Sequence, residues 1–145
     1  MNESQVVSII CNHLNRENWK FWIDDHPIHR ELNFNKHSIL IGGARPDIYG
    51  INNFNQIFAI EAKGLDDYKK AIGQALTYKA GVNLSYIGGI KEKLELIEDI
   101  ALSSGLGLIF INEQDEKLVS VERIFLIIFV QYFYLRKMRL NQKEN

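Results

Sequence analysis

Two carboxylates and one amine are the residues of this chain whose types and spacing could do chemistry. Glu61 and Lys63 end an apolar stretch that has the pattern of a β-strand, and Asp47 opens a shorter apolar stretch before it. Side chains alternate between faces along a strand, so Glu61 and Lys63 project together. Two carboxylates at one point need a counter-cation, and oxygen ligands suit Mg²⁺ or Mn²⁺. The chemistry expected is metal-assisted hydrolysis of a phosphodiester bond.

A hairpin has to bring these residues together. The two apolar stretches are joined by the turn sequence INNFNQ. A turn centred on Phe54 sets Asp47 opposite Glu61 and Ile48 opposite Ile60. Both carboxylates then lie on one face of the hairpin and both isoleucines on the other.

The helix predicted after the hairpin, which runs to about Lys79, adds two polar side chains. Gln74 and Tyr78 stand one turn apart on it. We expect Gln74 to orient Lys63 or a phosphate oxygen, and Tyr78 to support Gln74 by hydrogen bonding. The backbone carbonyl of Ala62 is a candidate for a further metal ligand. The packed stripe of the helix is predicted to be Leu65, Tyr68, Ile72, Ala75 and Leu76.

The N-terminal segment fits a helix over residues 3–16, because Val7, Ile10 and Leu14 share one stripe. Glu3 lies on the same stripe. Its carboxylate either complements the helix dipole at a solvated end or reaches the site as another metal ligand. The sequence leaves both interpretations open.

The segment from Asp24 to Ala44 has no regular pattern but holds His26, His29 and His37. Their spacing matches no zinc motif, so contact of basic loop side chains with a polyanion is favoured over zinc binding. Other positive side chains could follow a phosphate backbone. Those that we expect to contact nucleic acid are Lys36, Arg45 and Lys70.

Strands and helices alternate through the rest of the chain, which predicts right-handed crossovers and a sheet that is at least partly parallel. Gly88 and Gly89 are expected to end one of these strands. The later helix is predicted to pack through Leu94, Ile97, Ile100 and Ala101. The further elements are expected at residues 19–23, 84–87, 92–103, 106–111 and 118–121.

The C-terminal segment 121–139 is almost wholly apolar between Ile124 and Leu135. This stretch is too short to span a bilayer as a helix. We expect a helix, capped by Ser120, that packs on the core or on a partner in a dimer, although its β-branched residues leave a strand possible.

Composition indicates one domain, residues 1–145, because 46% hydrophobic residues can bury a core in a chain of this length. The formal charge of −1 indicates neither a nucleic-acid nor a membrane partner. Cys11 is the one cysteine, and no signal sequence is visible. A cytoplasmic protein without an internal disulfide is therefore expected.

The motifs of this chain resemble those of the PD-(D/E)xK nuclease superfamily. An acid-x-lysine triplet occurs three times, but the one at Glu61 ends an apolar strand and follows a Pro-Asp pair. Pro46-Asp47 resembles the PD element, Glu61-Ala62-Lys63 the ExK element, Glu3 the acidic residue of the first helix, and Gln74 the helical glutamine of several branches.

This resemblance implies a restriction endonuclease-like α/β fold, in which helices flank a mixed sheet of four or more strands. It also implies dependence on Mg²⁺ and cleavage of nucleic acid, most often DNA. We therefore expect a metal-dependent nuclease that acts on DNA. The alternative is a catalytically silent nucleic-acid-binding or assembly module. A homodimer is expected if both strands of a duplex are cut.

Overall fold

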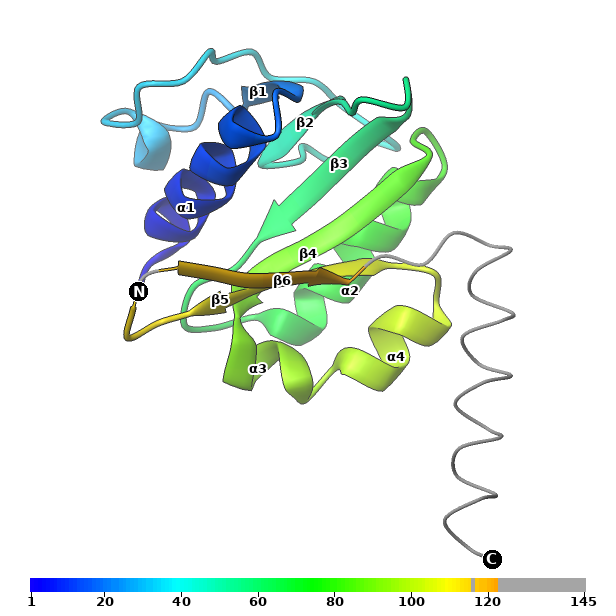
Figure 1. Ribbon diagram of the computed structural model, residues 1–145. Coiled ribbons are helices and arrows are strands. Elements are labelled where there is room, and N and C mark those ends of the chain that lie inside the picture. The colour runs from blue at the N-terminus through cyan, green and yellow to red at the C-terminus, as the bar shows by residue number, and fades with distance from the viewer. Residues whose placement is uncertain (116, 123–145) are drawn as a thin grey trace, which may run out of the picture.

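The structure of the protein is a computed structural model, which describes residues 1–115 and 117–122 (Figure 1). An N-terminal helix is followed along the chain by strands and shorter helices. The described elements, in chain order, are α1 Glu3–Arg16, β1 Lys20–Ile23, the 3-10 helix η1 Pro27–His29, β2 Ile48–Ile51, β3 Ile57–Ala62, α2 Tyr68–Lys79, β4 Leu84–Ile90, α3 Lys91–Glu95, α4 Glu98–Ser103, β5 Gly107–Asn112 and β6 Lys117–Glu122.

The strands form one sheet in the order β1-β2-β3-β4-β5-β6. β3 is parallel to β4 and β4 to β5, whereas the other neighbours are antiparallel. Parallel neighbours need crossovers, which α2 supplies between β3 and β4, and α3 with α4 between β4 and β5. The predicted α/β class with a mixed sheet flanked by helices is confirmed.

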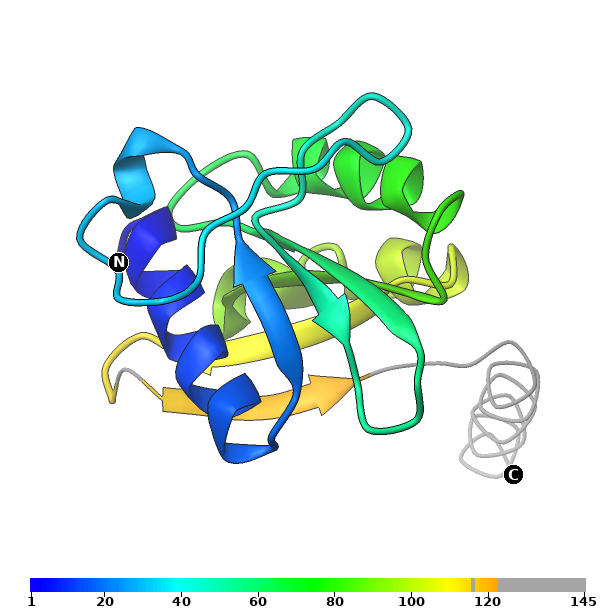
Figure 2. The same ribbon diagram turned by 90° about the horizontal axis from the view of Figure 1, so that it is seen from above.

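Helices α1 and α2 lie on opposite faces of this sheet, as Figure 2 shows. On the α1 face, Ile10 packs with Ile48 and Ile60 in one buried cluster. On the α2 face, Ala75 packs with Ile87 in a second. Burial on both faces explains why the central strands are nearly continuous apolar runs.

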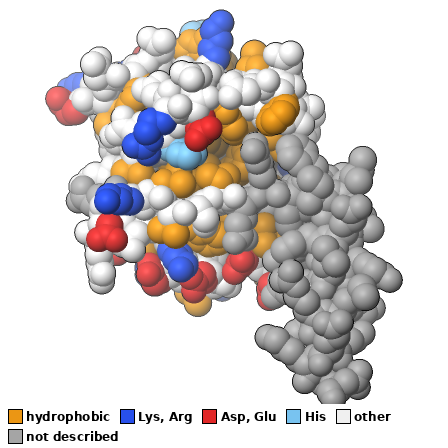
Figure 3. All heavy atoms as spheres, in the orientation of Figure 1, with side chains coloured by type: hydrophobic (Ala, Val, Ile, Leu, Met, Phe, Trp, Pro, Cys, Tyr) orange, Lys and Arg blue, Asp and Glu red, His pale blue; other side chains and the backbone are white. Residues whose placement is uncertain are grey.

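The α1 face also carries an apolar hollow of about 200 Å³ between α1 and β6. Figure 3 shows hydrophobic side chains gathered there. The hollow is separate from the charged site described below. Among its lining residues are Ile10, Leu14, Trp19, Leu118 and Val121.

The β2–β3 hairpin has the predicted register. Ile48 is paired with Ile60, and the amide of Asp47 donates to the carbonyl of Ile60 at 3.1 Å. Both isoleucines point into the core under α1, so Asp47 and Glu61 project toward the other face. The prediction that these carboxylates share a face is confirmed.

Gly88 and Gly89 lie inside β4, so the predicted end of this strand at Ile87 is wrong. A Cβ on Gly88 would overlap Cδ1 of Ile10 in α1, and one on Gly89 would overlap the ring of Tyr68 in α2. The two glycines let helices approach the strand from both sides. A packing glycine and a turn glycine look alike in sequence.

The helix predicted over residues 92–103 is two helices, because Ile97 has non-helical dihedral angles between α3 and α4. The break changes which side chains face the sheet. Ile100 is 60% exposed, contrary to the prediction, whereas Ala101 and Leu102 are buried.

The stripe predicted for α2 is wrong at Leu65 and Leu76, which are 56% and 41% exposed. Small residues allow α2 to lie close to the sheet. Gly73 does not serve this purpose, since a Cβ there would meet nothing within 4 Å. The buried residues of α2 are Tyr68, Ala71, Ala75 and Tyr78.

The strand predicted at 118–121 is confirmed by β6, whereas the helix predicted from Val121 is wrong at its first two residues. Ser120 pairs with Phe110 in the sheet and caps no helix, and Val121 and Glu122 continue β6. The remainder of the predicted segment, 123–139, lies outside the described residues. Within the described ranges, no helix is long and apolar enough to cross a membrane.

Candidate functional site

The carboxylate of Asp47 is hydrogen-bonded to the backbone of the neighbouring strand β3. Its Oδ2 atom accepts a hydrogen bond of 2.7 Å from the amide of Ala62, one residue beyond Glu61. Only 11% of the Asp47 side chain is exposed. The backbone bond fixes one oxygen and leaves Oδ1 directed into the site. Sequence analysis assigned the carbonyl of Ala62 to the site, and that ligand role stays a prediction.

Glu61 and Lys63 form a buried ion pair beside Asp47, with Nζ 3.1 Å from Oε1. Burial, followed by the charge of Asp47, raises the pKa of Glu61 to about 7. Burial alone would lower the pKa of Lys63, but attraction to Glu61 and the hydrogen bond between them raise it above its ordinary value. At neutral pH the amine is therefore an ammonium group.

Tyr78 contacts Glu61 rather than Gln74, which corrects the sequence prediction. Its hydroxyl bonds to Oε2 of Glu61 and to the carbonyl of Arg45. Burial and the charge of Glu61 raise the pKa of Tyr78 well above its usual range, so the phenol keeps its proton. The side chain of Glu61 is thus held at both oxygens, by Lys63 and by Tyr78.

Gln74 reaches the same cleft from α2, as predicted. The cleft has a volume of about 380 Å³ and contains all the predicted acids together with Lys63. The Oε1 atom of Gln74 is buried and has no hydrogen-bond partner within the described residues. An unpaired amide oxygen in a charged cleft is available to an incoming group.

Glu3 enters the cleft from the first turn of α1. The helix N-terminus is already closed by a capping box, in which Asn2 and Gln5 bond to each other's amides. Burial, followed by the charge of Asp47, raises the pKa of Glu3. Gly64 allows this approach, because a Cβ there would overlap the backbone of Asn2 and Glu3. Of the two interpretations, the structure favours the carboxylate at the site.

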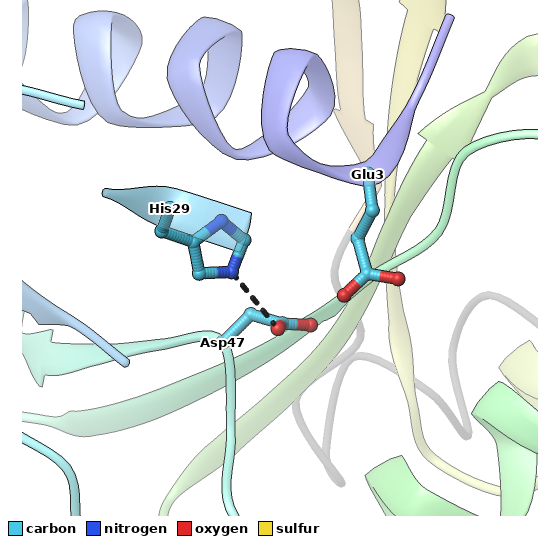
Figure 4. A group of neighbouring side chains, drawn as sticks. All are labelled: Glu3, His29 and Asp47. Carbon is cyan, nitrogen blue, oxygen red and sulfur yellow. Dashed lines mark ion pairs between the residues drawn. The ribbon is translucent and has the colours of Figure 1, made fainter. Parts of the chain in front are cut away.

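His29 lies at the site in another role than the one predicted from sequence, where it was grouped with His26 and His37 as a basic loop side chain. It is fully buried, and its Nε2 atom lies 3.5 Å from Oδ1 of Asp47 (Figure 4). Within the described chain, neither ring nitrogen has a hydrogen-bond partner. Pro27 begins the short helix η1, which turns His29 inward, and this local HPIH sequence was the available signal.

The other two loop histidines have structural contacts. His26 accepts a bond from the amide of Ile28 and so caps η1, and Nδ1 of His37 lies 2.7 Å from the hydroxyl of Tyr49. The expectation that the loop histidines contact a polyanion as basic side chains is wrong for His29, because its side chain is fully buried.

The donor set fits a divalent cation. Glu3, His29 and Asp47 each offer one ligand atom, and these atoms lie within 4.8 Å of one another. Figure 4 shows the three side chains converging from α1, η1 and the start of β2. Carboxylates suit Mg²⁺ and Mn²⁺, while an imidazole favours a transition metal. An imidazole without hydrogen bonds agrees with a ligand role.

The predicted nucleic-acid contacts differ in their surroundings. Arg45 lines the cleft, where Nη2 lies 2.9 Å from the buried carboxylate of Asp24. The ammonium group of Lys36 bonds to the carbonyls of Leu32 and Phe34 and holds its own loop. Lys70 is exposed on α2 and does not line the cleft.

The fold and the site define an α/β protein with an acidic, lysine-containing cleft, and known proteins share its fold. No family model and no curated protein matches the sequence. An XisH family protein from Nostoc punctiforme is 12% identical, with a TM-score of 0.56 over 82% of this chain and 99% of its own.

Two further solved structures are similar. An fdxN element excision controlling factor protein from Anabaena variabilis is 14% identical, with a TM-score of 0.55 over 82% of this chain and 98% of its own. A protein of unknown function from Silicibacter pomeroyi is 14% identical, with a TM-score of 0.56 over 100% of this chain and 94% of its own. At these identities the likeness concerns the fold.

Proposed function

We propose that this chain is a metal-dependent nuclease of the PD-(D/E)xK superfamily that hydrolyses phosphodiester bonds in DNA. The observation that carries the proposal is the convergence of Asp47, Glu61 and Lys63 in one cleft. The positions of Glu3 and His29 support it, because each offers a ligand atom within 4.8 Å of that of Asp47.

The cation would be held by Asp47, Glu3 and His29, with Glu61 and the carbonyl of Ala62 as further ligands. A bound divalent cation offsets charge on the scissile phosphate and makes the attacking water more acidic. The imidazole of His29 favours Mn²⁺ over Mg²⁺ as the working ion.

Lys63 acts as a cation in this proposal. Because its pKa is raised, it keeps its proton at neutral pH and is a poor general base. Its ammonium group orients the attacking water and offsets negative charge. As the water oxygen bonds to phosphorus, its proton passes to solvent, and as the bond to the leaving oxygen breaks, that oxygen takes a proton from solvent. The amide NH2 group of Gln74 donates to a phosphate oxygen, and Tyr78 keeps Glu61 in place.

The name of one structural neighbour agrees with a role in nucleic-acid processing. One neighbour is called an excision controlling factor, and a protein with that role could either cut DNA or assist a protein that does. The second candidate is therefore a DNA-binding module without catalysis, and turnover separates the two.

The proposal is tested by incubating the purified protein with duplex, single-stranded and branched DNA, and with RNA, in EDTA, Mg²⁺ or Mn²⁺. We expect DNA cleavage that needs the metal. Lys63→Ala and Asp47→Ala should lose more than about 100-fold in rate while remaining folded, as a cooperative unfolding transition shows.

Lys117→Ala and Asp115→Ala are the matched controls, because both residues are exposed and belong to another acid-x-lysine triplet. They should cut at the wild-type rate. Cleavage that survives in Lys63→Ala overturns the proposal. Binding without turnover under either metal favours the silent module instead.

A further inference from the structure

The sheet face that carries Asp47 and Glu61 extends over β1 and β2, beyond the strands on which the helices of this face pack. On this face α2 packs on β3 and β4, and α3 and α4 pack on β4 and β5. Ile51 and Ile57, at the far end of the β2–β3 hairpin, are 40% and 46% exposed. Figure 2 shows β1 and β2 to one side of α2.

Two aromatic rings stand on this open part of the face. Trp22 of β1 is paired with Tyr49 of β2, and their rings are stacked at 5.5 Å between centroids with 20° between planes. Their neighbours Ile23 and Ile48 point into the α1 core, so Trp22 and Tyr49 point the other way. Both rings are half-buried, and each keeps surface that a ligand can contact.

The aromatic pair is next to the candidate metal site. Tyr49 follows Asp47 by two residues on the same face, which is roughly 6.6 Å along a strand. The hydroxyl of Tyr49 is held by His37 at 2.7 Å, so the ring has a fixed orientation. A nucleoside attached to a phosphate at Asp47 could reach these rings.

We propose that Trp22 and Tyr49 form a stacking platform for a base of single-stranded DNA beside the scissile phosphate. This inference rests on the proposed nuclease function and names its substrate class. Aromatic side chains bind unpaired bases by stacking, whereas the bases of a duplex already stack on each other.

The charges of the site agree with this substrate. Of the described cations, Arg45 and Lys63 line the cleft, and each is paired with a carboxylate, Asp24 or Glu61. Lys36 is bonded to backbone carbonyls. A site with neutralised cations gains little from the dense charge of a duplex backbone, so stacking has to supply the affinity.

The test uses Trp22 as its own reporter. The chain has two tryptophans, and Trp19→Phe leaves Trp22 as the single one. This variant, in EDTA, is titrated with an oligothymidylate strand, with the duplex of the same strand, and with the matching RNA strand. We expect the single DNA strand to quench Trp22 emission and to bind about tenfold more tightly than the duplex.

Ring substitutions supply a second measurement. Tyr49→Leu should weaken single-strand binding about tenfold, while Tyr49→Phe, which keeps the ring, should stay within twofold of the parent. Phe54→Ala is the matched control, since Phe54 is 73% exposed at the hairpin turn and away from the pair. Thermal unfolding identifies any variant that fails to fold.

The outcomes separate this inference from the nuclease proposal. Equal affinity for duplex and single strand, or unchanged Trp22 emission at saturation, overturns the platform even if DNA is cleaved. Quenching by the single strand without cleavage under Mg²⁺ or Mn²⁺ supports the platform and overturns the nuclease. RNA that binds as tightly as DNA overturns the assignment of the platform to DNA.

Discussion

Nε2 of His29 lies 3.5 Å from Oδ1 of Asp47 in a fully buried position, and neither ring nitrogen is hydrogen-bonded within the described residues. The imidazole nitrogen lies within 4.8 Å of the ligand atoms of Glu3 and Asp47. Imidazole nitrogen and carboxylate oxygen are ligands of divalent transition metals. This arrangement is a reason to expect Mn²⁺ to bind at the cluster.

Replacing His29 should weaken metal binding. His29→Gln removes the imidazole ligand, and the affinity for Mn²⁺ should fall at least about tenfold, with a smaller change for Mg²⁺, which depends on oxygen ligands. In the wild type, Mn²⁺ at 100 times its Kd should stabilise the fold by about 2.7 kcal/mol. Isothermal titration calorimetry and thermal unfolding measure both effects.

His13→Gln is the control for this substitution, because His13 is half-buried on α1 at the apolar hollow, away from the cleft. It should leave the affinity for Mn²⁺ unchanged. Equal Mn²⁺ affinity in the wild type and in His29→Gln would remove His29 from the ligand set.

The stability of the metal-free protein should fall as pH rises from about 4.5 to about 7. The pKa of Glu61 is raised from 4.5 to about 7 in the folded chain, chiefly by burial. In this window the unfolded chain releases the proton and the folded chain keeps it, so rising pH favours unfolding. Above pH 7 this contribution is fully lost and the slope ends. Urea midpoints in EDTA at pH 5, 6, 7 and 8 measure the effect.

Glu61→Gln separates this effect from other titrating groups, because glutamine has no proton to lose. Its stability should depend less on pH between 5 and 7 than that of the wild type. Identical slopes in the two proteins would contradict the raised pKa of Glu61. Saturating Mn²⁺ should also flatten the wild-type slope, since a cation favours the ionised carboxylate.

The hairpin and its carboxylates could be predicted from sequence because strand periodicity alone fixes which face a side chain occupies. A turn centred on Phe54 places Ile48 opposite Ile60, and in that register Asp47 shares a face with Glu61. The same periodic argument found α1 within its observed bounds. Local pattern was sufficient where the contact partners are themselves local or paired in register.

The features that failed depend on distant contacts. Gly88 was mistaken for a turn residue because Ile10, which requires its lack of a side chain, lies far away in sequence. His29 was taken for a basic loop side chain because only the fold turns the short helix η1 toward Asp47. Tyr78 was assigned to its helical neighbour Gln74 because its true partner, Glu61, is on another element.

Removing the hydroxyl of Tyr78 should affect both stability and the site. Tyr78→Phe leaves Oε2 of Glu61 and the carbonyl of Arg45 without the donor that Tyr78 supplies, which should cost about 1–3 kcal/mol, while Lys63 still contacts Oε1 of Glu61. The hydrogen bond from Tyr78 lowers the pKa of Glu61, so its loss should shift metal binding to higher pH. Chemical unfolding and Mn²⁺ titrations at several pH values measure the two effects.

Tyr68→Phe is the matched control, because the hydroxyl of Tyr68 is also buried and bonds to backbone groups of Lys63, Gly64 and Ile90. It should lose similar stability and keep the wild-type pH dependence of metal binding. A shift of equal size in both variants would show that the effect is structural and not specific to Glu61.

Two glycine substitutions test how closely the helices approach the sheet. Gly89→Ala should destabilise by about 1–3 kcal/mol, because the new methyl group would overlap the ring of Tyr68 in α2. Gly73→Ala should stabilise by about 0.5–1 kcal/mol, because Gly73 lies inside α2 with open space around it. Each kcal/mol corresponds to about 2–4 °C in Tm. Thermal unfolding of both variants measures the contrast, and a Gly89→Ala protein as stable as the wild type would refute the close packing of α2 on β4.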